Sequence, residues 1–320
     1  KGGDDTGSGR VSPPASGGDT SADAPKPPTA RQRQEYLPVI GKLSVAGADI
    51  GEPANGANGP IYELDNAVTD AGILTLRDPG YAFGLRLTSP KLTDAAVTAC
   101  ARFPSLVYFS LNKAKGVTAA GAAELAKMRN LRVLELTDMP VEDAWLVPLR
   151  SLPELRRVNL YNAHRVTDAG LAHLSGLAHL RQINFHHTRV TGSGLGSLGR
   201  AKELNRVYLN EQSDAALKAL AKIGKLHALE EALTTAEVRP LAAADVTKFA
   251  VRGPVTDAGL KEVTAFPNLT HLYLRGDKVT TASLPFLKTL KKLKYLELGF
   301  STTAEQREEL TTALPGCEIH

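Results

Sequence analysis

An internal repeat constrains the fold of this chain more than any other feature. The string Val-Thr-Asp-Ala-Gly occurs at residues 68–72, 166–170 and 255–259, and looser copies begin at residues 92, 117, 141, 190 and 279. Each copy is followed by apolar residues three apart and then by a short Leu-x-x-Leu-x-Leu segment, a pattern typical of a helix and then a strand. Most strand segments are 23 to 25 residues apart. A period of this length predicts a solenoid of stacked repeats.

The residue types explain how one repeat folds. In the unit that starts at Val166, Thr167 is placed to cap a helix, and Asp168 in the first turn suits the helix dipole. Ala and Gly at the next two positions allow close packing against the neighbouring helix. The following apolar residues are predicted to face the core: Leu171, Leu174, Leu177, Leu180, Ile183 and Phe185. One unit buries too little to offset the entropy of ordering it, so the units must stack.

These motifs resemble the leucine-rich-repeat family, in particular ribonuclease-inhibitor-like solenoids, the repeats of F-box leucine-rich proteins and related bacterial repeat proteins. The resemblance implies a right-handed α/β solenoid, a horseshoe with parallel strands on the concave face and helices on the convex face. It covers residues 59–320, with about ten to eleven repeats of 20–25 residues including a closing half-repeat at the end. Many family members carry Asn or Cys three positions after the last strand Leu. Here other residues stand there, so the usual Asn ladder is not expected: Ala163, Thr188, Gln212 and Asp277.

The remaining segments break the repeat. Residues 1–35 are rich in Gly, Pro and Ser and have balanced charges, which predicts a disordered spacer. Residues 36–58 are expected to cap the first repeat. Within 226–253 the spacing is compressed; we expect a strand ending at Glu231 and a local bend or irregular turn. The chain starts at Lys1, which favours removal of a leader and a cell-envelope or secreted location over a cytoplasmic one.

Composition excludes several classes of protein. A net charge of +4 over 320 residues is too weak to demand a nucleic-acid or membrane partner. Two cysteines, Cys100 and Cys317, cannot form a disulfide framework. No run of about 18 apolar residues is present in the sequence, so no membrane span is expected.

Sequence motifs for catalysis are not convincing. Residues 194–199 match G-x-G-x-x-G but lack the strand–turn–helix context of a dinucleotide site. His186 and His187 have no third ligand at metal spacing. No nucleophile elbow, zinc-protease helix or phosphate loop is found. We therefore predict a protein that is not an enzyme and uses no cofactor or metal.

The outward positions of the strands contain the candidate binding residues. Tyr and Arg, which are enriched at binding hot spots, recur there. The predicted binding set comprises Tyr108, Arg157, Asn159, Tyr161, Asn184, His186, Arg206, Tyr208, His271, Tyr273, Arg275 and Tyr295. The strand propensity of Tyr explains part of this pattern equally well.

The sequence thus predicts a recognition scaffold that binds a protein through its concave face and acts as a monomer. One alternative is the substrate-recognition subunit of a ligase-type complex, although residues 1–58 are too polar for an F-box. Another is a weakly basic binder of nucleic acid or an anionic ligand. Such a ligand would be bound by the basic residues of the strand face, Arg157, Arg206, Lys248, Arg252 and Arg275. Three acidic residues interrupt the same face: Glu135, Glu230 and Glu297.

Overall fold

A computed structural model describes residues 29–32, 48–49, 59–64, 66–234 and 242–320. The predicted spacer (1–35) and cap (36–58) lie outside the described residues, apart from 29–32 and the short strand at 48–49.

The described chain alternates strands with short helices. The strands are β1 (Ala48–Asp49), β2 (Pro60–Leu64), β3 (Phe83–Thr88), β4 (Leu106–Asn112), β5 (Val133–Thr137), β6 (Arg157–Asn159), β7 (Gln182–Asn184), β8 (Arg206–Tyr208), β9 (Ala232–Leu233), β10 (Lys248–Val251), β11 (His271–Leu274), β12 (Tyr295–Glu297) and β13 (Glu318–Ile319). The α-helices are α2 (Asp70–Leu74), α3 (Asp94–Cys100), α4 (Ala119–Glu124), α5 (Asp214–Lys222), α6 (Asp257–Leu260), α7 (Leu284–Leu287) and α8 (Ala304–Ala313). Short 3-10 helices complete the layer: η2 (Leu125–Lys127), η3 (Asp143–Ser151), η4 (Gly170–Leu174), η5 (Ser193–Arg200), η6 (Leu226–Ala228), η7 (Ala243–Asp245), η8 (Lys261–Ala265) and η9 (Thr281–Ser283).

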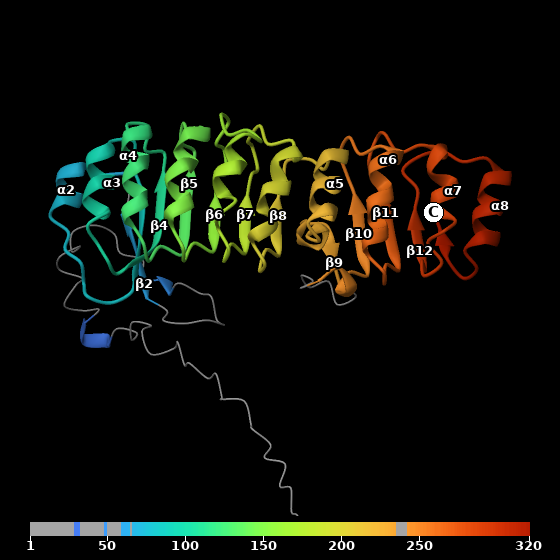
Figure 1. Ribbon diagram of the computed structural model, residues 1–320, viewed down its shortest axis with the longest axis horizontal. Coiled ribbons are helices and arrows are strands. Elements are labelled where there is room, and N and C mark those ends of the chain that lie inside the picture. The colour runs from blue at the N-terminus through green and yellow to red at the C-terminus, as the bar shows by residue number, and fades with distance from the viewer. Residues whose placement is uncertain (1–28, 33–47, 50–58, 65, 235–241) are drawn as a thin grey trace, which may run out of the picture.

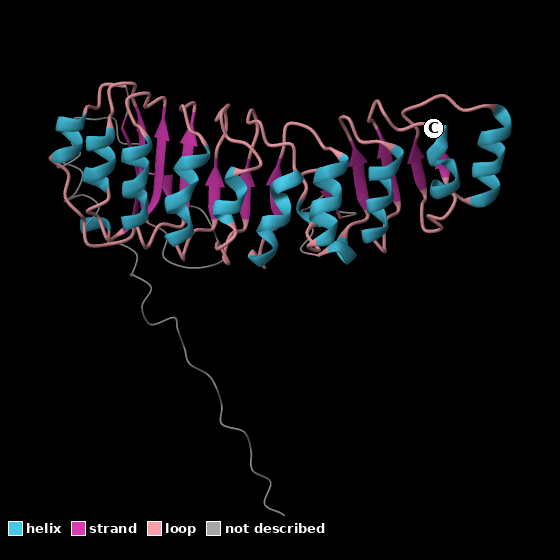
Figure 2. Ribbon diagram, turned by 45° about the horizontal axis from the view of Figure 1, so that its top comes forward, coloured by secondary structure: helices cyan, strands magenta, loops and turns pink. Residues whose placement is uncertain are grey.

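The strands form one layer and the helices the other (Figures 1 and 2). Strands β2 to β8 run parallel in chain order, as do β10 to β13, while β1 is antiparallel to β2. The apolar residues predicted to face inward, such as Leu171, Ile183 and Phe185, are fully buried between the two layers. The fold is therefore an α/β leucine-rich-repeat solenoid, as predicted.

Asp and Thr side chains join successive repeats through hydrogen bonds. The Asp94 carboxylate accepts the Thr118 backbone N–H at 2.7 Å and the Thr118 hydroxyl at 2.6 Å. The Thr118 Oγ1 in turn accepts from Ala120 N, so it caps α4 as predicted. The same two bonds recur in six pairs: Asp70–Thr93, Asp94–Thr118, Asp143–Thr167, Asp168–Thr191, Asp214–Thr256 and Asp257–Thr280. The Asp of the motif thus belongs to the interface between repeats as well as to its own helix.

The glycine of the motif makes room for that carboxylate. A Cβ atom on Gly121, Gly170 or Gly259 would lie 2.2, 2.4 or 2.0 Å from Oδ1 of the preceding Asp. Trp145 occupies the equivalent position in its repeat and is buried. It fits because the preceding repeat has Ala119 in place of the Asp. The close packing predicted for this glycine is confirmed.

Residues 223–234 and 242–247, the parts of the segment between α5 and β10 that the structure describes, interrupt the regular repeat. Asp214 bonds directly to Thr256, and α5 packs against α6, so no repeat lies between them in the helix layer. The predicted irregularity is confirmed. Of the predicted strand ending at Glu231, a single parallel bridge is present, between Leu229 and Val207 of β8. Leu226–Ala228 is a 3-10 helix, and β9 pairs antiparallel with β10. The Gln212 side chain takes over part of the missing backbone pairing by donating to Ala250 O and accepting from Arg252 N.

The steric role of the glycine gives a first prediction. Gly170→Ala should destabilise the protein by about 1–3 kcal/mol, because its Cβ meets the Asp143 carboxylate. Gly72→Ala is the matched control: its nearest neighbour would be 3.9 Å away, so the change should be neutral or gain up to about 1 kcal/mol in helix propensity. Urea unfolding of both variants measures the difference.

Adding Asp143→Ala to Gly170→Ala separates the clash from a general intolerance of alanine. The double variant should be more stable than the sum of the two single changes, because the carboxylate that the new Cβ meets is gone. Strict additivity would contradict this account of the glycine.

A second prediction concerns pH. Burial alone would raise the pKa of Asp168, but hydrogen bonds from Thr191, Gly194 and Ser193 outweigh it and hold the pKa below its usual value. A depressed folded-state pKa contributes stability that is present above the unfolded pKa and lost as pH falls through the folded one. Unfolding free energy measured between about pH 5 and 2 should therefore fall less steeply in Asp168→Asn than in the wild type. An identical slope in the two proteins would rule out this contribution.

Candidate functional site

The outward side chains of the parallel strands line one face of the solenoid, called here the strand face. Register places them in rows: Arg157 is paired with Gln182 and then Arg206, and Asn159 with Asn184 and then Tyr208. Further along, His271 is paired with Tyr295 in the second sheet. The predicted residues accordingly fall into two groups. The central patch comprises Arg157, Asn159, Tyr161, Asn184, His186, Arg206 and Tyr208, and the C-terminal patch comprises His271, Tyr273, Arg275 and Tyr295.

The aromatic rings of the central patch hold one another in place. Tyr161 meets His187 edge-on with ring centroids 5.0 Å apart, and His186 meets Tyr208 at 5.9 Å. Tyr161 is 38% exposed, whereas most large apolar side chains in the described residues are buried. Arg206 is exposed, and its guanidinium has no hydrogen-bond or ion-pair partner among the described residues. The patch therefore offers ordered rings beside a free cation.

The two asparagines of the central patch have a local structural role. Asn159 Oδ1 accepts the backbone N–H of Tyr161 at 3.1 Å, and Asn184 Oδ1 accepts that of His186 at 2.8 Å. Each bond shapes the turn that follows its strand. Their first effect is to position Tyr161 and His186.

Tyr108 lies on the strand face but is not available at the surface. It is only 3% exposed and packs against Ile61 and Val133. Its hydroxyl donates to Glu135 at 2.7 Å and accepts from Arg86, which also pairs with Glu63. Burial and the neighbouring Glu135 raise the pKa of Tyr108 to about 12. Including Tyr108 in the contact surface was therefore a mistake: an alternation pattern assigns a side chain to a face but does not show what covers it.

The C-terminal patch is a stack of rings beside a closed ion pair. Tyr295 stacks on His271 at 5.9 Å and lies 5.3 Å from Tyr273. Arg275 lies over the Tyr273 ring and donates to both Glu297 oxygens, at 3.0 and 3.2 Å. These bonds hold the pKa of Glu297 below its usual range. Arg275 is thus already neutralised.

Sequence reasoning missed His320 in this patch. Its ring stacks on Tyr295 with centroids 5.0 Å apart. The residue follows β13, which pairs in parallel with β12, so the closing half-repeat brings it into the row. The repeat period, extended one strand further, would have found it.

Glu230, from the segment between α5 and β10, also borders the central patch. Its Oε2 lies 3.7 Å from His186 Nε2. This segment carries β9, the strand at which the second sheet ends, so it lies between the two patches.

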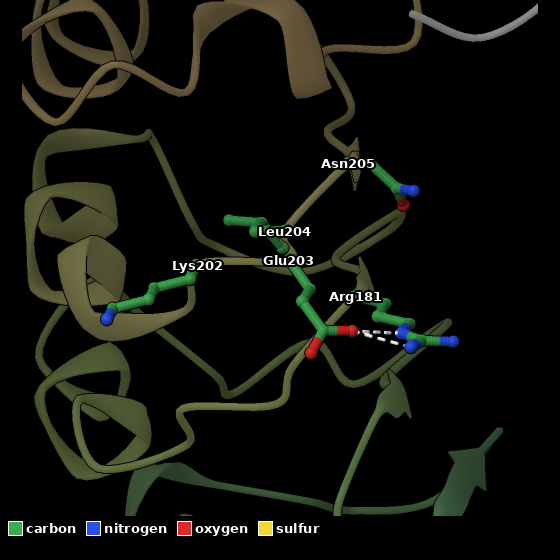
Figure 3. A pocket seen from close by; sticks show the side chains of 5 residues that line it. All are labelled: Arg181, Lys202, Glu203, Leu204 and Asn205. Atoms are coloured by element: carbon green, nitrogen blue, oxygen red, sulfur yellow. Dashed lines mark hydrogen bonds and ion pairs between the residues drawn. The ribbon is translucent and has the colours of Figure 1, made fainter. Parts of the chain in front are cut away.

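Other features considered in the sequence have structural explanations. The glycine-rich residues 194–199 lie inside η5, where Leu195 and Leu198 are buried. A small hollow of about 320 Å³ at the start of β7 and β8 is lined by the Arg181–Glu203 ion pair, with an N–O distance of 2.6 Å (Figure 3). Arg181 lowers the pKa of Glu203.

Within the described ranges, no group of three or more His, Cys, Asp or Glu side chains could hold a metal ion. No helix in that part of the chain is long and apolar enough to cross a membrane.

Comparison with known proteins adds little to this geometry. No protein-family model matches the chain, and no curated protein matches it. Solved structures that resemble it include two internalins from Listeria monocytogenes strain 4b F2365, each 17% identical. The internalin inlF match covers 94% of this chain and 98% of that one with a TM-score of 0.45; internalin C2 (inlC2) covers 85% and 96% with a TM-score of 0.42. The assignment as a leucine-rich-repeat protein therefore rests on the repeats, the parallel strands and the Asp–Thr bonds of the chain itself.

Proposed function

We propose that this protein is a non-enzymatic recognition scaffold that binds a protein partner through its strand face. The observation that supports this most is the central patch, which has Tyr208 and the unpaired Arg206 on β8 and Tyr161 in the turn after β6. We also propose that its Val-Thr-Asp-Ala-Gly-Leu repeat belongs to the ribonuclease-inhibitor-like subtype of leucine-rich repeats, of the bacterial type.

The chemistry of the patch favours a protein over other ligands. Tyr and Arg combine a large contact area with polar groups, and they dominate the energetics of protein interfaces. The edge-on contacts of Tyr161 with His187 and of Tyr208 with His186 fix the rings before a partner arrives. Prior ordering lowers the entropic cost of binding.

Charge argues against a polyanion on the strand face. Glu230 lies beside His186, and Glu297 neutralises Arg275. A phosphate backbone crossing both patches would approach these carboxylates closely. The nucleic-acid alternative is therefore the weaker one, and no contact on this face favours a ligase role specifically.

We expect the central patch to contribute more than the C-terminal one. Arg206 is free to pair with a partner's carboxylate, whereas Arg275 would first have to leave Glu297. Tyr108, buried and bonded to Glu135, is expected to act on stability alone.

Alanine substitution tests the proposal, which is the third prediction. A photo-crosslinking residue placed at the Tyr161 position should capture a partner that the same residue at the exposed Leu74 on α2 does not. Affinity for that partner, measured by calorimetry, should fall by about tenfold or more in Tyr161→Ala, Arg206→Ala or Tyr208→Ala.

Leu74→Ala and Arg200→Ala, on the helix side, are the matched controls and should leave the affinity unchanged. Tyr108→Phe should lower the unfolding free energy but not the affinity. A partner that binds all central-patch variants as tightly as the wild type would refute the assignment of this face.

A further inference from the structure

A groove lies at the edge of the solenoid where the first strands end. The loops that follow β2, β3, β4, β5 and β6 line this groove of about 820 Å³. Its volume is within the range of about 300–1,000 Å³ typical of ligand sites. None of the residues on the strand face proposed above lines it.

Loop length explains why the groove lies at this place. Three of these loops start alike, because Lys113, Asp138 and Asn162 all adopt a left-handed bend, with φ of 60°, 55° and 65°. After the bend they differ: Val117 follows Leu111 by six positions and Val166 follows Leu160 by six, but Val141 follows Leu136 by only five. The shorter middle loop therefore forms a floor between two longer walls.

The walls of the groove carry free positive charge. Lys113 and Lys115 come from one wall and Arg165 from the other, and all three are exposed. Their side chains have no hydrogen-bond or ion-pair partner among the described residues. The single carboxylate in the lining, Asp138, accepts a hydrogen bond from Asn162 Nδ2 at 2.5 Å. The lining therefore carries three positive charges and one carboxylate, and that carboxylate already accepts a hydrogen bond.

The floor of the groove is apolar. Pro90 and Pro140 form its accessible apolar surface, whereas Met139, also in the lining, is only 3% exposed and belongs to the core. A ligand that matched this surface would need negative charge at its edges and an apolar group between them.

We propose that this groove binds an extended acidic peptide segment that carries an apolar side chain. Its carboxylates pair with Lys113, Lys115 and Arg165, and its apolar residue rests on Pro90 and Pro140. The apolar floor distinguishes such a peptide from a nucleic-acid strand, whose repeated phosphates would leave Pro90 and Pro140 without a complementary contact. The groove would act independently of the strand face.

Three labelled peptides of equal length test the proposal on the full chain, and their binding is the fourth prediction. One contains Glu around a central Leu, one has Gln in place of that Leu, and one contains Lys around the Leu. Fluorescence anisotropy should show the Glu–Leu peptide binding at least tenfold more tightly than either of the others. Raising the salt concentration should weaken its binding.

Charge reversal localises the effect. The combined variant Lys113→Glu, Lys115→Glu and Arg165→Glu should lose at least tenfold in affinity for the Glu–Leu peptide. The control variant Arg200→Glu, Lys218→Glu and Lys222→Glu, which changes net charge equally on η5 and α5, should bind it like the wild type. Circular dichroism melting confirms that both variants are folded.

The remaining outcomes overturn the proposal. Absence of binding to the Glu–Leu peptide, no preference over the Gln peptide, an equal loss in both triple variants, or tighter binding of an oligothymidine of similar length would each do so. Tyr161→Ala should leave peptide binding unchanged. A result in which Tyr161→Ala abolishes it would place the peptide on the strand face instead.

Discussion

Each Asp of the repeat motif accepts two hydrogen bonds from the Thr of the following repeat, one from its backbone N–H and one from its hydroxyl. In all these pairs except Asp168–Thr191, the same Thr also accepts a backbone N–H at the start of the helix of its own repeat, so one pair of side chains fixes both the start of a helix and its distance from its neighbour. Bonds to a charged acceptor are among the stronger hydrogen bonds in proteins. Because the helices are short, they depend on this link and on the shared core for their stability.

The requirements of that link account for the exceptions in the sequence. Where Ala119 replaces the Asp, Glu142 replaces the next Thr and Trp145 replaces the next Gly. All three changes belong to one interface, in which a bulky ring occupies the space that a carboxylate occupies elsewhere. Between β8 and β10 the link joins Asp214 directly to Thr256, so the helix layer continues while the sheet is interrupted.

Because the Asp–Thr hydrogen bonds and the core hold the repeats together, the residues on the other surfaces can vary. Helix spacing is fixed on one side by Asp and Thr, so the outward strand positions and the loop lengths can change without loss of the stack. The strand face uses this freedom in two ways. Near β2 to β5 its polar groups satisfy one another around Tyr108, and near β6 to β8 they leave Arg206 and Tyr161 open. The loops after β4 and β6 use it to build the walls of a groove.

The repeat period and the types of residue in each unit determined the fold, the helix caps and the buried leucines, because these follow from local sequence and its periodicity. The alternation of each strand also placed the predicted residues in two rows. Only the tertiary structure decided that Tyr108 is covered, that the segment at Glu231 interrupts the sheet and that His320 completes the C-terminal stack. Burial and pairing between distant segments depend on which other residues pack over a side chain. The sequence pattern of a single repeat does not specify those residues.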